Sequence, residues 1–526
     1  MTRNFEAPGR SVAVGRDGMA ATSHPQSTLA AIEILKAGGS AIDAAVGACA
    51  VQCVVEAGST GIGGDCFALI APEGADRIIA YNGSGRAPAA AELEWYERAG
   101  TTEIERTSPH AVTVPGAVEA WSRLVADHGR MKLGEILAPA VELARNGYTI
   151  TPRVAHDLDG QRELLSRDAR AVFLLDGRAP TAGEIQRQPQ LADMLEEIGR
   201  EGASAFYRSR AAADMVRFLR ERGGLHTEED FAEACGEYVT PISASFRGCQ
   251  VHECPPNGQG VIALMILKIL DRFTPKPDPL DADNLHIEVE ATRLAYAARD
   301  VWLADGEVPV DGLLSDKLAD ELASRIDPDR ALPVLPSFDS VEHRDTVYIS
   351  VVDKDRNAVS FINSIFYPYG SGLMEPRTGV LFHNRAQSFS LKRGHPNAIG
   401  PRRRPMHTII PAMLSRDGRV RMSFGVMGGH YQAMGHAYFL SKVIDHRMDL
   451  QAAVELPRLF PLPGTRTVEM EERLRNLVGA EFQRRGFAVK SPAWAIGGAQ
   501  AIWIDWDRGT LLGASDPRKD GCALGY

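Results

Sequence analysis

The sequence has little of what marks membrane and secreted proteins. Its most apolar stretch, residues 41–55, is interrupted by Asp43 and Gln52 and is short of the roughly 20 apolar residues that a membrane span needs. We therefore expect a buried helix there and no membrane partner. The first residues show no apolar core of the kind that a secretory signal requires, so we expect a cytoplasmic protein.

Positive charge and paired cysteines are also scarce. The chain carries 58 Lys and Arg against 68 Asp and Glu, for a net charge of -10, which offers no electrostatic basis for binding nucleic acid. Its 7 cysteines are an odd number, and no two have the C-x-x-C spacing typical of zinc sites. We expect reduced thiols and no metal.

Several catalytic and cofactor motifs are missing. The glycine cluster at residues 61–65 does not have the G-x-G-x-x-G spacing of a dinucleotide site, and no P-loop follows any strand. Neither a G-x-S-x-G elbow nor an H-E-x-x-H pair occurs, so the sequence does not support a serine hydrolase of that type or a zinc protease. We expect no cofactor. We interpret His-Ile-Glu-Val-Glu at residues 286–290 as a solvated polar helix face and not as a metal site.

What the chain does contain is the material for a large layered core. It has 526 residues, 44% of them hydrophobic, which predicts either two or more domains or one unusually large core. Apolar spacing predicts helices over residues 27–55 (a hairpin broken at Gly38-Gly39), 133–222, 286–303, 431–446 and 471–485. Strands are predicted over residues 66–70, 346–352, 358–366, 420–424 and 499–506, and residues 331–343 are predicted to be exposed and extended.

One of these strand pairs places two hydroxyl groups together. Residues 353–357, Asp-Lys-Asp-Arg-Asn, form a turn sequence between two alternating segments. If Asp353 faces Asn357 across that turn, Thr346 lies opposite Ser364 on the neighbouring strand. A threonine hydroxyl becomes a good nucleophile when a base removes its proton, and a free α-amino group on the same residue can be that base. The alternative is that Thr346 is an ordinary β-branched residue at the start of a strand.

Motifs throughout the chain resemble the gamma-glutamyltranspeptidase family. The matching segments are residues 37–45, 61–64, 114–116, 345–359, 369–373, 379–384, 425–429 and 513–518, in the family's order. The resemblance implies an α+β fold, a four-layer αββα sandwich of the N-terminal nucleophile hydrolase type. It further implies a precursor that cuts itself between Asp345 and Thr346, giving fragments 1–345 and 346–526 that stay associated as one interleaved core.

The resemblance also assigns the chemistry of the nucleophile. Thr346 takes the nucleophile position, with its freed amine as general base, and Ser364 stands where the family has a threonine that hydrogen-bonds the nucleophile. Gly428 and Gly429 match the segment whose backbone N–H groups bind the oxyanion. For this glycine pair the alternative is a plain flexible turn after a strand.

The positions that bind substrate in the family carry different residues here. The family's carboxylate-binding arginine falls at Ser84, with Arg86 two residues away, and the remaining replacements are Phe366, Arg385, Ser388, His407 and Thr408. An α-ammonium group would be repelled by Arg385 and would find no carboxylate at Ser388. A carboxylate would be held by Arg385 and Arg86, with His407 and Thr408 as further donors. The alternatives are a structural salt bridge for Arg385 and a satisfied core histidine for His407.

These substitutions predict the type of substrate. We expect hydrolysis of a small-molecule amide whose acyl group bears a carboxylate and no α-amino group, as the resemblance to the cephalosporin acylase and oxamate amidohydrolase subgroup implies. Two alternatives stay open: a gamma-glutamyltransferase or glutathione hydrolase, and a catalytically silent relative that acts as a binding protein. A homodimer is a further possible partner arrangement.

Overall fold

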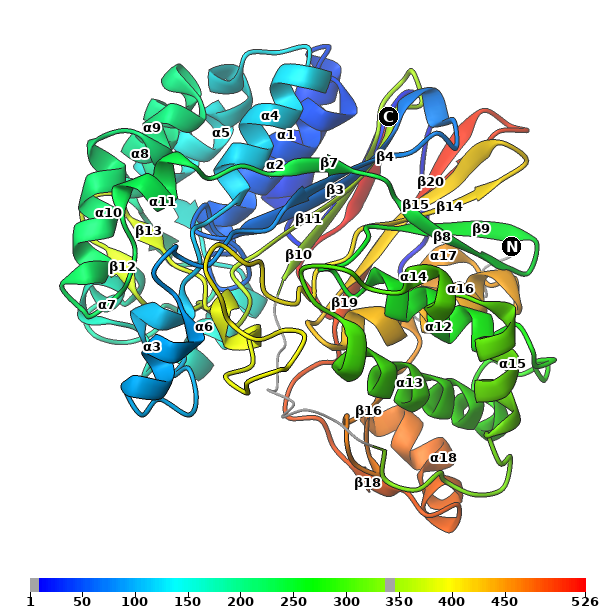
Figure 1. Ribbon diagram of the computed structural model, residues 1–526. Coiled ribbons are helices and arrows are strands. Elements are labelled where there is room, and N and C mark those ends of the chain that lie inside the picture. Colours follow the sequence, from blue (N-terminus) through cyan, green and yellow to red (C-terminus); the bar gives the residue numbers. More distant parts are fainter. Residues whose placement is uncertain (1–8, 336–345) are drawn as a thin grey trace.

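The protein is described by a computed structural model that places residues 9–335 and 346–526. Two seven-stranded sheets lie face to face, and helices cover the outer face of each (Figure 1). The α+β four-layer arrangement expected for the family is thus confirmed. The two sheets bury apolar side chains between them, among them Phe67, Tyr348 and Ile502.

The first sheet contains the predicted hairpin at its centre. Its strands, in spatial order, are β21 (Ala523–Gly525), β2 (Met19–Ala21), β10 (Val347–Val352), β11 (Ala358–Ser364), β3 (Asp65–Ala71), β4 (Ile79–Gly83) and β7 (Glu237–Val239). Every residue of β3, β10 and β11 is buried. These strands have helices on one face and the second sheet on the other, which explains why they are apolar along nearly their whole length.

The second sheet is likewise antiparallel. Its strands, in spatial order, are β1 (Ala13–Gly15), β20 (Thr510–Ser515), β19 (Gly498–Asp505), β15 (Arg419–Met427), β14 (Ala412–Arg416), β9 (Cys249–Glu253) and β8 (Ile242–Phe246). Strands β15 and β19 pack on β10. Both sheets therefore combine strands from before and after residue 346.

Helices form the two outer layers. Against the first sheet lie α1 (Pro25–Lys36), α2 (Ala41–Val55) and α4 (Ala117–His128), while α5 (Leu133–Asn146) packs on α2, and α8 (Pro189–Glu201) packs on α5. Against the second lie α12 (Gly260–Leu270), α16 (Tyr431–Ile444) and α17 (Leu450–Glu455), while α13 (Ala282–Trp302) packs on α12 and α16, and α18 (Glu472–Arg484) packs on α13. The predicted hairpin of residues 27–55 is confirmed as α1 and α2. Ser40 and Asp43 cap α2 reciprocally, and all of its 15 residues are buried.

Shorter elements connect these layers. They are α3 (Leu93–Arg98), α6 (Pro152–Gln161), α7 (Arg167–Phe173), α9 (Ala203–Tyr207), α10 (Arg210–Arg220), α11 (Glu228–Ala232), α14 (Val310–Leu313), α15 (Asp316–Ser324), η1 (Pro72–Gly74), η2 (Pro109–Ala111), η3 (Arg385–Ser388), β5 (Tyr148–Thr149), β6 (Ile185–Gln186), β12 (Met374–Glu375), β13 (Val380–Leu381), β16 (Leu459–Pro461), β17 (Thr467–Met470) and β18 (Ala488–Lys490). Within the placed parts of the chain, no helix is both long enough and apolar enough to cross a membrane.

The interpretation of residues 286–290 as a solvated helix face is wrong. His286, Glu288 and Glu290 are all buried on α13. Glu288 accepts hydrogen bonds from Lys442 at 2.7 Å and Ser441 at 2.8 Å, and Glu290 pairs with Arg293 at 2.8 Å. Buried charges persist when they are paired in this way, and the cationic partner of Glu288 lies too far along the chain for the local pattern to reveal it.

The Glu290–Arg293 pair also holds the chain that leads toward residue 346. Glu290 accepts from the Leu332 N–H at 3.1 Å, and Arg293 donates to the Pro333 carbonyl at 2.8 Å. Ala331 is buried, whereas Val334 is 61% exposed. The expectation of an exposed, extended segment is therefore wrong at Ala331, and residues 336–343 of that segment lie outside the described residues.

Candidate active site

The hairpin of β10 and β11 has the predicted register. Val347 pairs with Asn363 and Val352 with Ala358. The Asp353 carboxylate accepts from the backbone N–H of Asp355 and of Asn357, which closes the turn. The same register, continued by one residue, places Thr346 opposite Ser364, and their hydroxyl oxygens are 3.3 Å apart.

The hydrogen bonds around Ser364 determine which hydroxyl donates. Ser364 Oγ accepts from the Phe366 N–H at 2.9 Å and from Arg385 Nη2 at 3.4 Å. With both acceptor positions in use, its own proton points to Thr346 Oγ1. Gln432 Nε2, in the first turn of α16, lies 3.5 Å from the same Thr346 oxygen. Two donors therefore converge on Thr346 Oγ1, an arrangement that stabilises negative charge developing there.

Gly428 and Gly429 form the turn from β15 into α16. Their φ angles are +121° and +57°, values that favour glycine. A Cβ on Gly428 would come within 2.9 Å of the Gly497 Cα. The Gly429 carbonyl accepts from Gln259 Nε2 at 2.9 Å. Both glycines thus lie at the N-terminal end of the helix that carries Gln432, where N–H groups favour anions. Their role as oxyanion donors stays a prediction.

Arg385 contacts two of the other predicted pocket residues. Its guanidinium lies 4.0 Å from the centre of the Phe366 ring, and Nη1 donates to Thr408 Oγ1 at 3.0 Å. The side chain is fully buried. Burial lowers the pKa of Arg385 to about 9, although the nearby Asp65 carboxylate opposes that change. Arg385 is therefore a buried cation directly behind Ser364.

The counter-charge of Arg385 is Asp65, at the start of β3, which the sequence analysis did not identify. One Asp65 oxygen accepts from the backbone N–H of Gly85 at 2.9 Å and of Gly116 at 3.2 Å. The other accepts from His407 Nε2 at 3.0 Å and lies 3.9 Å from Arg385 Nε. An aspartate directly before an apolar strand was the available signal, since a buried carboxylate must have partners.

Electrostatics in this cluster keep Asp65 ionised. Burial would raise the pKa of Asp65, but His383, His407 and Arg385 outweigh it and lower the pKa to about 2. Burial, aided by the charge of Arg385, lowers the pKa of His407 to about 3, so its imidazole is neutral. His407 is thus hydrogen-bonded to Asp65 within the core, and Arg385 has its nearest carboxylate in Asp65, as the two alternative interpretations anticipated.

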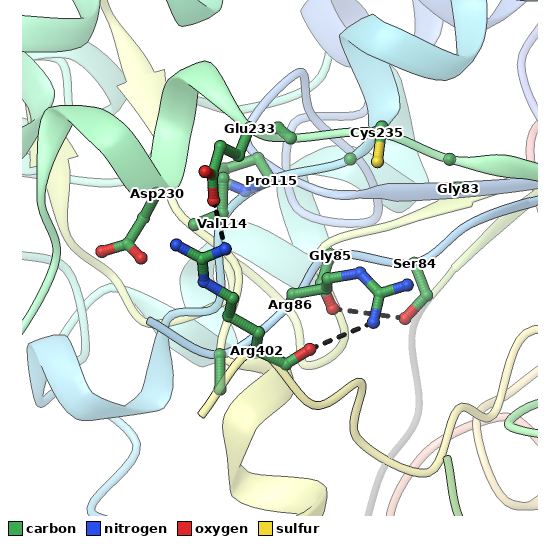
Figure 2. A pocket seen from close by; sticks show the side chains of 14 residues that line it. Gly83, Ser84, Gly85, Arg86, Val114, Pro115, Asp230, Glu233, Cys235 and Arg402 are labelled. Carbon is green, nitrogen blue, oxygen red and sulfur yellow. Dashed lines mark hydrogen bonds and ion pairs between the residues drawn. The ribbon is translucent and has the colours of Figure 1, made fainter. Parts of the chain in front are cut away.

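Arg86 and Ser388 do not join this cluster. Arg86 donates to the Arg402 carbonyl at 3.0 Å, lies 3.8 Å from Asp305, and its side chain is 37% exposed. With Ser84, it lines a cavity of about 400 Å³ (Figure 2). The Ser388 carbonyl accepts from Asn397 at 2.5 Å. Binding of one carboxylate by Arg86 and Arg385 together therefore has no support in the contacts of the described residues.

The described parts of the chain contain neither a cluster of metal ligands nor a disulfide bond. No group of three or more His, Cys, Asp or Glu is placed to hold a metal ion there. The cysteines at 49, 53, 66, 235, 249, 254 and 522 are unpaired. Asp345, the residue before the predicted cut, lies outside the described residues.

The four-layer fold is that of the N-terminal nucleophile hydrolases. The sequence profile described as gamma-glutamyltranspeptidase matches residues 27–526. The chain is 35% identical to an oxamate amidohydrolase proenzyme of Klebsiella pneumoniae, with 98% of this chain and 99% of that protein covered. It is 32% identical to a glutathione hydrolase-like proenzyme of Bacillus subtilis, with 97% and 99% covered.

A solved structure agrees with these sequence matches. A cephalosporin acylase from Bacillus halodurans superposes with a TM-score of 0.92 at 36% identity, covering 100% of this chain and 99% of that one. The chain belongs to the gamma-glutamyltranspeptidase family. It is an enzyme of the amide hydrolase and acyltransferase class, in a family whose named members include proenzymes.

Proposed function

We propose that the protein cuts its own chain between Asp345 and Thr346 and then uses Thr346 to hydrolyse an amide whose small acyl group carries a carboxylate. In the cut, Thr346 Oγ1 attacks the carbonyl carbon of residue 345, the peptide C–N bond breaks, and an ester forms. Water hydrolyses that ester and leaves Thr346 with a free α-amino group. This amine is the base that takes the hydroxyl proton in later turnovers.

The observation that supports the proposal best is the contact between Thr346 Oγ1 and Ser364 Oγ, 3.3 Å apart, with Arg385 on the far side of Ser364 at 3.4 Å. The nucleophile and a buried cation are thus separated by a single side chain. An acyl group that reaches Thr346 with its carbonyl carbon has its far end near Arg385. A guanidinium binds a carboxylate there through two parallel hydrogen bonds.

Turnover follows from the same groups. Thr346 Oγ1 adds to the amide carbonyl, and the tetrahedral oxyanion is stabilised by the N–H groups of Gly428 and Gly429. Each such donor contributes about 3 kcal/mol to the lowering of the barrier. The amine leaves with a proton, and water then releases the acyl group from Thr346. Hydrolysis, with water as acceptor, is the reaction we propose.

A second candidate is hydrolysis or transfer of gamma-glutamyl groups. It is favoured by the name of the Bacillus subtilis relative, a glutathione hydrolase-like proenzyme. The cluster opposes it, because a substrate α-ammonium group would lie close to Arg385 and the Asp65 carboxylate is already occupied by two backbone N–H groups and His407. A gamma-glutamyl donor should therefore react much more slowly than a glutaryl amide of the same length, and acceleration by dipeptide acceptors would instead support transfer.

The deciding experiment compares the wild type with Thr346→Ala and Thr346→Ser. Intact mass and N-terminal sequencing of the wild type should show fragments that meet between Asp345 and Thr346, while Thr346→Ala stays whole. Thr346→Ser, which keeps a hydroxyl, should be cut more slowly. Oxamate, glutaryl amides and gamma-glutamyl amides are then assayed in turn. An uncut wild type would leave the catalytically silent binding protein as the better explanation.

Two further proposals concern the setting of the enzyme. We place it in the cytoplasm, which fractionation of the native host would test. We also propose that the fragments stay associated after the cut and that the assembled enzyme forms a homodimer, which light scattering on the processed protein would test. A processed particle with the mass of one chain would exclude the dimer.

A further inference from the structure

His383 lies beside the buried Asp65–Arg385 cluster behind Ser364 and has one ring nitrogen that can still be protonated. His383 follows β13, and its Nε2 lies 2.9 Å from the Thr113 carbonyl oxygen. A carbonyl oxygen can only accept a hydrogen bond, so Nε2 carries the proton. In the neutral ring, Nδ1 is then unprotonated and carries a lone pair. This Nδ1 is buried, has no hydrogen-bond partner among the described residues, and faces the Asp65 carboxylate at 3.6 Å. An unprotonated nitrogen thus faces a buried anion.

Without a bound substrate, the charges around His383 cancel. The titratable groups near His383 are Asp65 at the start of β3, Arg385 two residues along its own segment, His407 from the segment before β14, and His226. The charges of Asp65 and Arg385 balance, and both are buried. A substrate carboxylate on Arg385 adds an uncompensated negative charge, which is costly in a buried site.

We propose that His383 is a specificity-determining residue that takes up one proton from solvent when a substrate carboxylate binds to Arg385, and then donates through Nδ1 to Asp65. The inference rests on the proposed function of Arg385. Binding then adds one anion and one proton together, so the buried cluster stays neutral. A neutral acyl group brings no charge and takes up no proton. The site thereby distinguishes carboxylated from uncharged acyl groups.

His383 suits this role better than His407 does. His407 Nδ1 already accepts from the Ile409 N–H at 3.3 Å, while Nε2 donates to Asp65, so a second proton would displace an existing hydrogen bond. In His383 the corresponding nitrogen has no such bond to lose. Burial lowers the pKa of His383, Asp65 raises it, and Arg385 lowers it. A carboxylate bound to Arg385 offsets that last contribution and raises the pKa of His383 again.

The kinetic test uses two chromogenic anilides that differ only in the terminal carboxylate, glutaryl-p-nitroanilide and pentanoyl-p-nitroanilide. The ratio of their kcat/KM values cancels the titration of the Thr346 amine. Linkage predicts that this ratio rises as the pH falls from 9 toward 6, by up to about tenfold for each unit. In His383→Gln the ratio should no longer depend on pH.

Two further variants complete the design. His226→Gln is the matched control, because His226 is also buried, donates to a carbonyl at 2.9 Å and has an unpartnered Nδ1, yet no hydrogen bond or ion pair joins it to Asp65 or Arg385 within the described structure. It should keep the wild-type slope. Asp65→Asn removes the anion that His383 would face, so this variant should bind the glutaryl substrate without taking up a proton. Its ratio of kcat/KM values should therefore not depend on pH, which keeps the test available if His383→Gln fails to fold.

Calorimetry keeps the inference testable if neither anilide is turned over. Glutarate is titrated into the processed enzyme in buffers of different ionisation enthalpy, and we expect uptake of up to about one proton that His383→Gln abolishes. Turnover of both anilides with a ratio that does not change with pH would overturn the inference and leave the proposed function intact. Failure of glutarate and both anilides to bind would overturn both.

Discussion

Replacing Ser364 by alanine tests the central contact of the proposed mechanism. The Ser364 hydroxyl is 3.3 Å from Thr346 Oγ1 and donates to it. As Oγ1 gains negative charge, this becomes a hydrogen bond to a charged group, worth about 1.5 to 3 kcal/mol. Its loss should lower kcat/KM by roughly 10- to 100-fold. Gln432 remains as a second donor, so residual turnover should be measurable.

The same substitution should act on self-cleavage and on stability. In the wild type the Phe366 N–H donates to Ser364 Oγ at 2.9 Å, and Ser364→Ala removes that acceptor. A buried N–H left in that way costs about 1 to 3 kcal/mol of folding free energy. Self-cleavage uses the same Oγ1 and should slow by a similar factor to turnover, whereas Ser364→Thr keeps the hydroxyl and should retain both activities.

The assay for Ser364 separates these effects. Intact mass followed over time gives the rate of self-cleavage, an anilide assay on the fully processed fraction gives kcat/KM, and thermal unfolding gives the loss of stability. A Ser364→Ala enzyme that processes and turns over within about twofold of the wild type would contradict the proposed role of the hydroxyl. So would a Ser364→Thr enzyme that is as impaired as the alanine variant at equal stability.

Substitutions at three positions test the surrounding structure. The pKa of Asp65 is lowered from 3.8 to about 2. Ionised Asp65 therefore adds about 2 kcal/mol to the free energy of unfolding above pH 4, and this contribution is lost as the pH falls toward 2. In Asp65→Asn, the free energy of unfolding should not show this fall between pH 4 and pH 2. Gly428→Ala, with φ at +121° and a Cβ 2.9 Å from Gly497, should lose about 100-fold in kcat with little change in secondary structure by circular dichroism. Arg293→Met leaves Glu290 buried without its cation and should cost about 3 to 5 kcal/mol in urea unfolding, and Arg293→Lys should recover part of it.

Local pattern was enough to predict the hairpin and most helices. Alternation and a turn of five polar residues determine the register of β10 and β11, because each strand constrains its neighbour directly along the chain. The position of Ser364 opposite Thr346 follows from that register alone. The helices of residues 27–55 are equally local, since glycines separate them and their apolar residues recur at helical spacing.

The charge cluster could not be predicted in the same way. Asp65 contacts residues at positions 85, 116, 383, 385 and 407, and only the packed sheets bring these segments together. Arg86 is the opposite case. It is two residues from Ser84 and lines the same cavity, but its side chain donates to the Arg402 carbonyl and does not contact Arg385 or Asp65 in the described structure. Distance in sequence therefore concealed Asp65, whereas a role of Arg86 in substrate binding stays a prediction.

The order of strands in the first sheet has a consequence for how the enzyme is made. Strands β10 and β11, from after residue 346, lie between β2 and β3, from before it. Either fragment alone would present unpaired strand edges, which favour aggregation. If the chain is cut as we propose, a single precursor supplies both fragments in equal number and pairs their strands in register, so the covalent link is needed only until the sheet has formed.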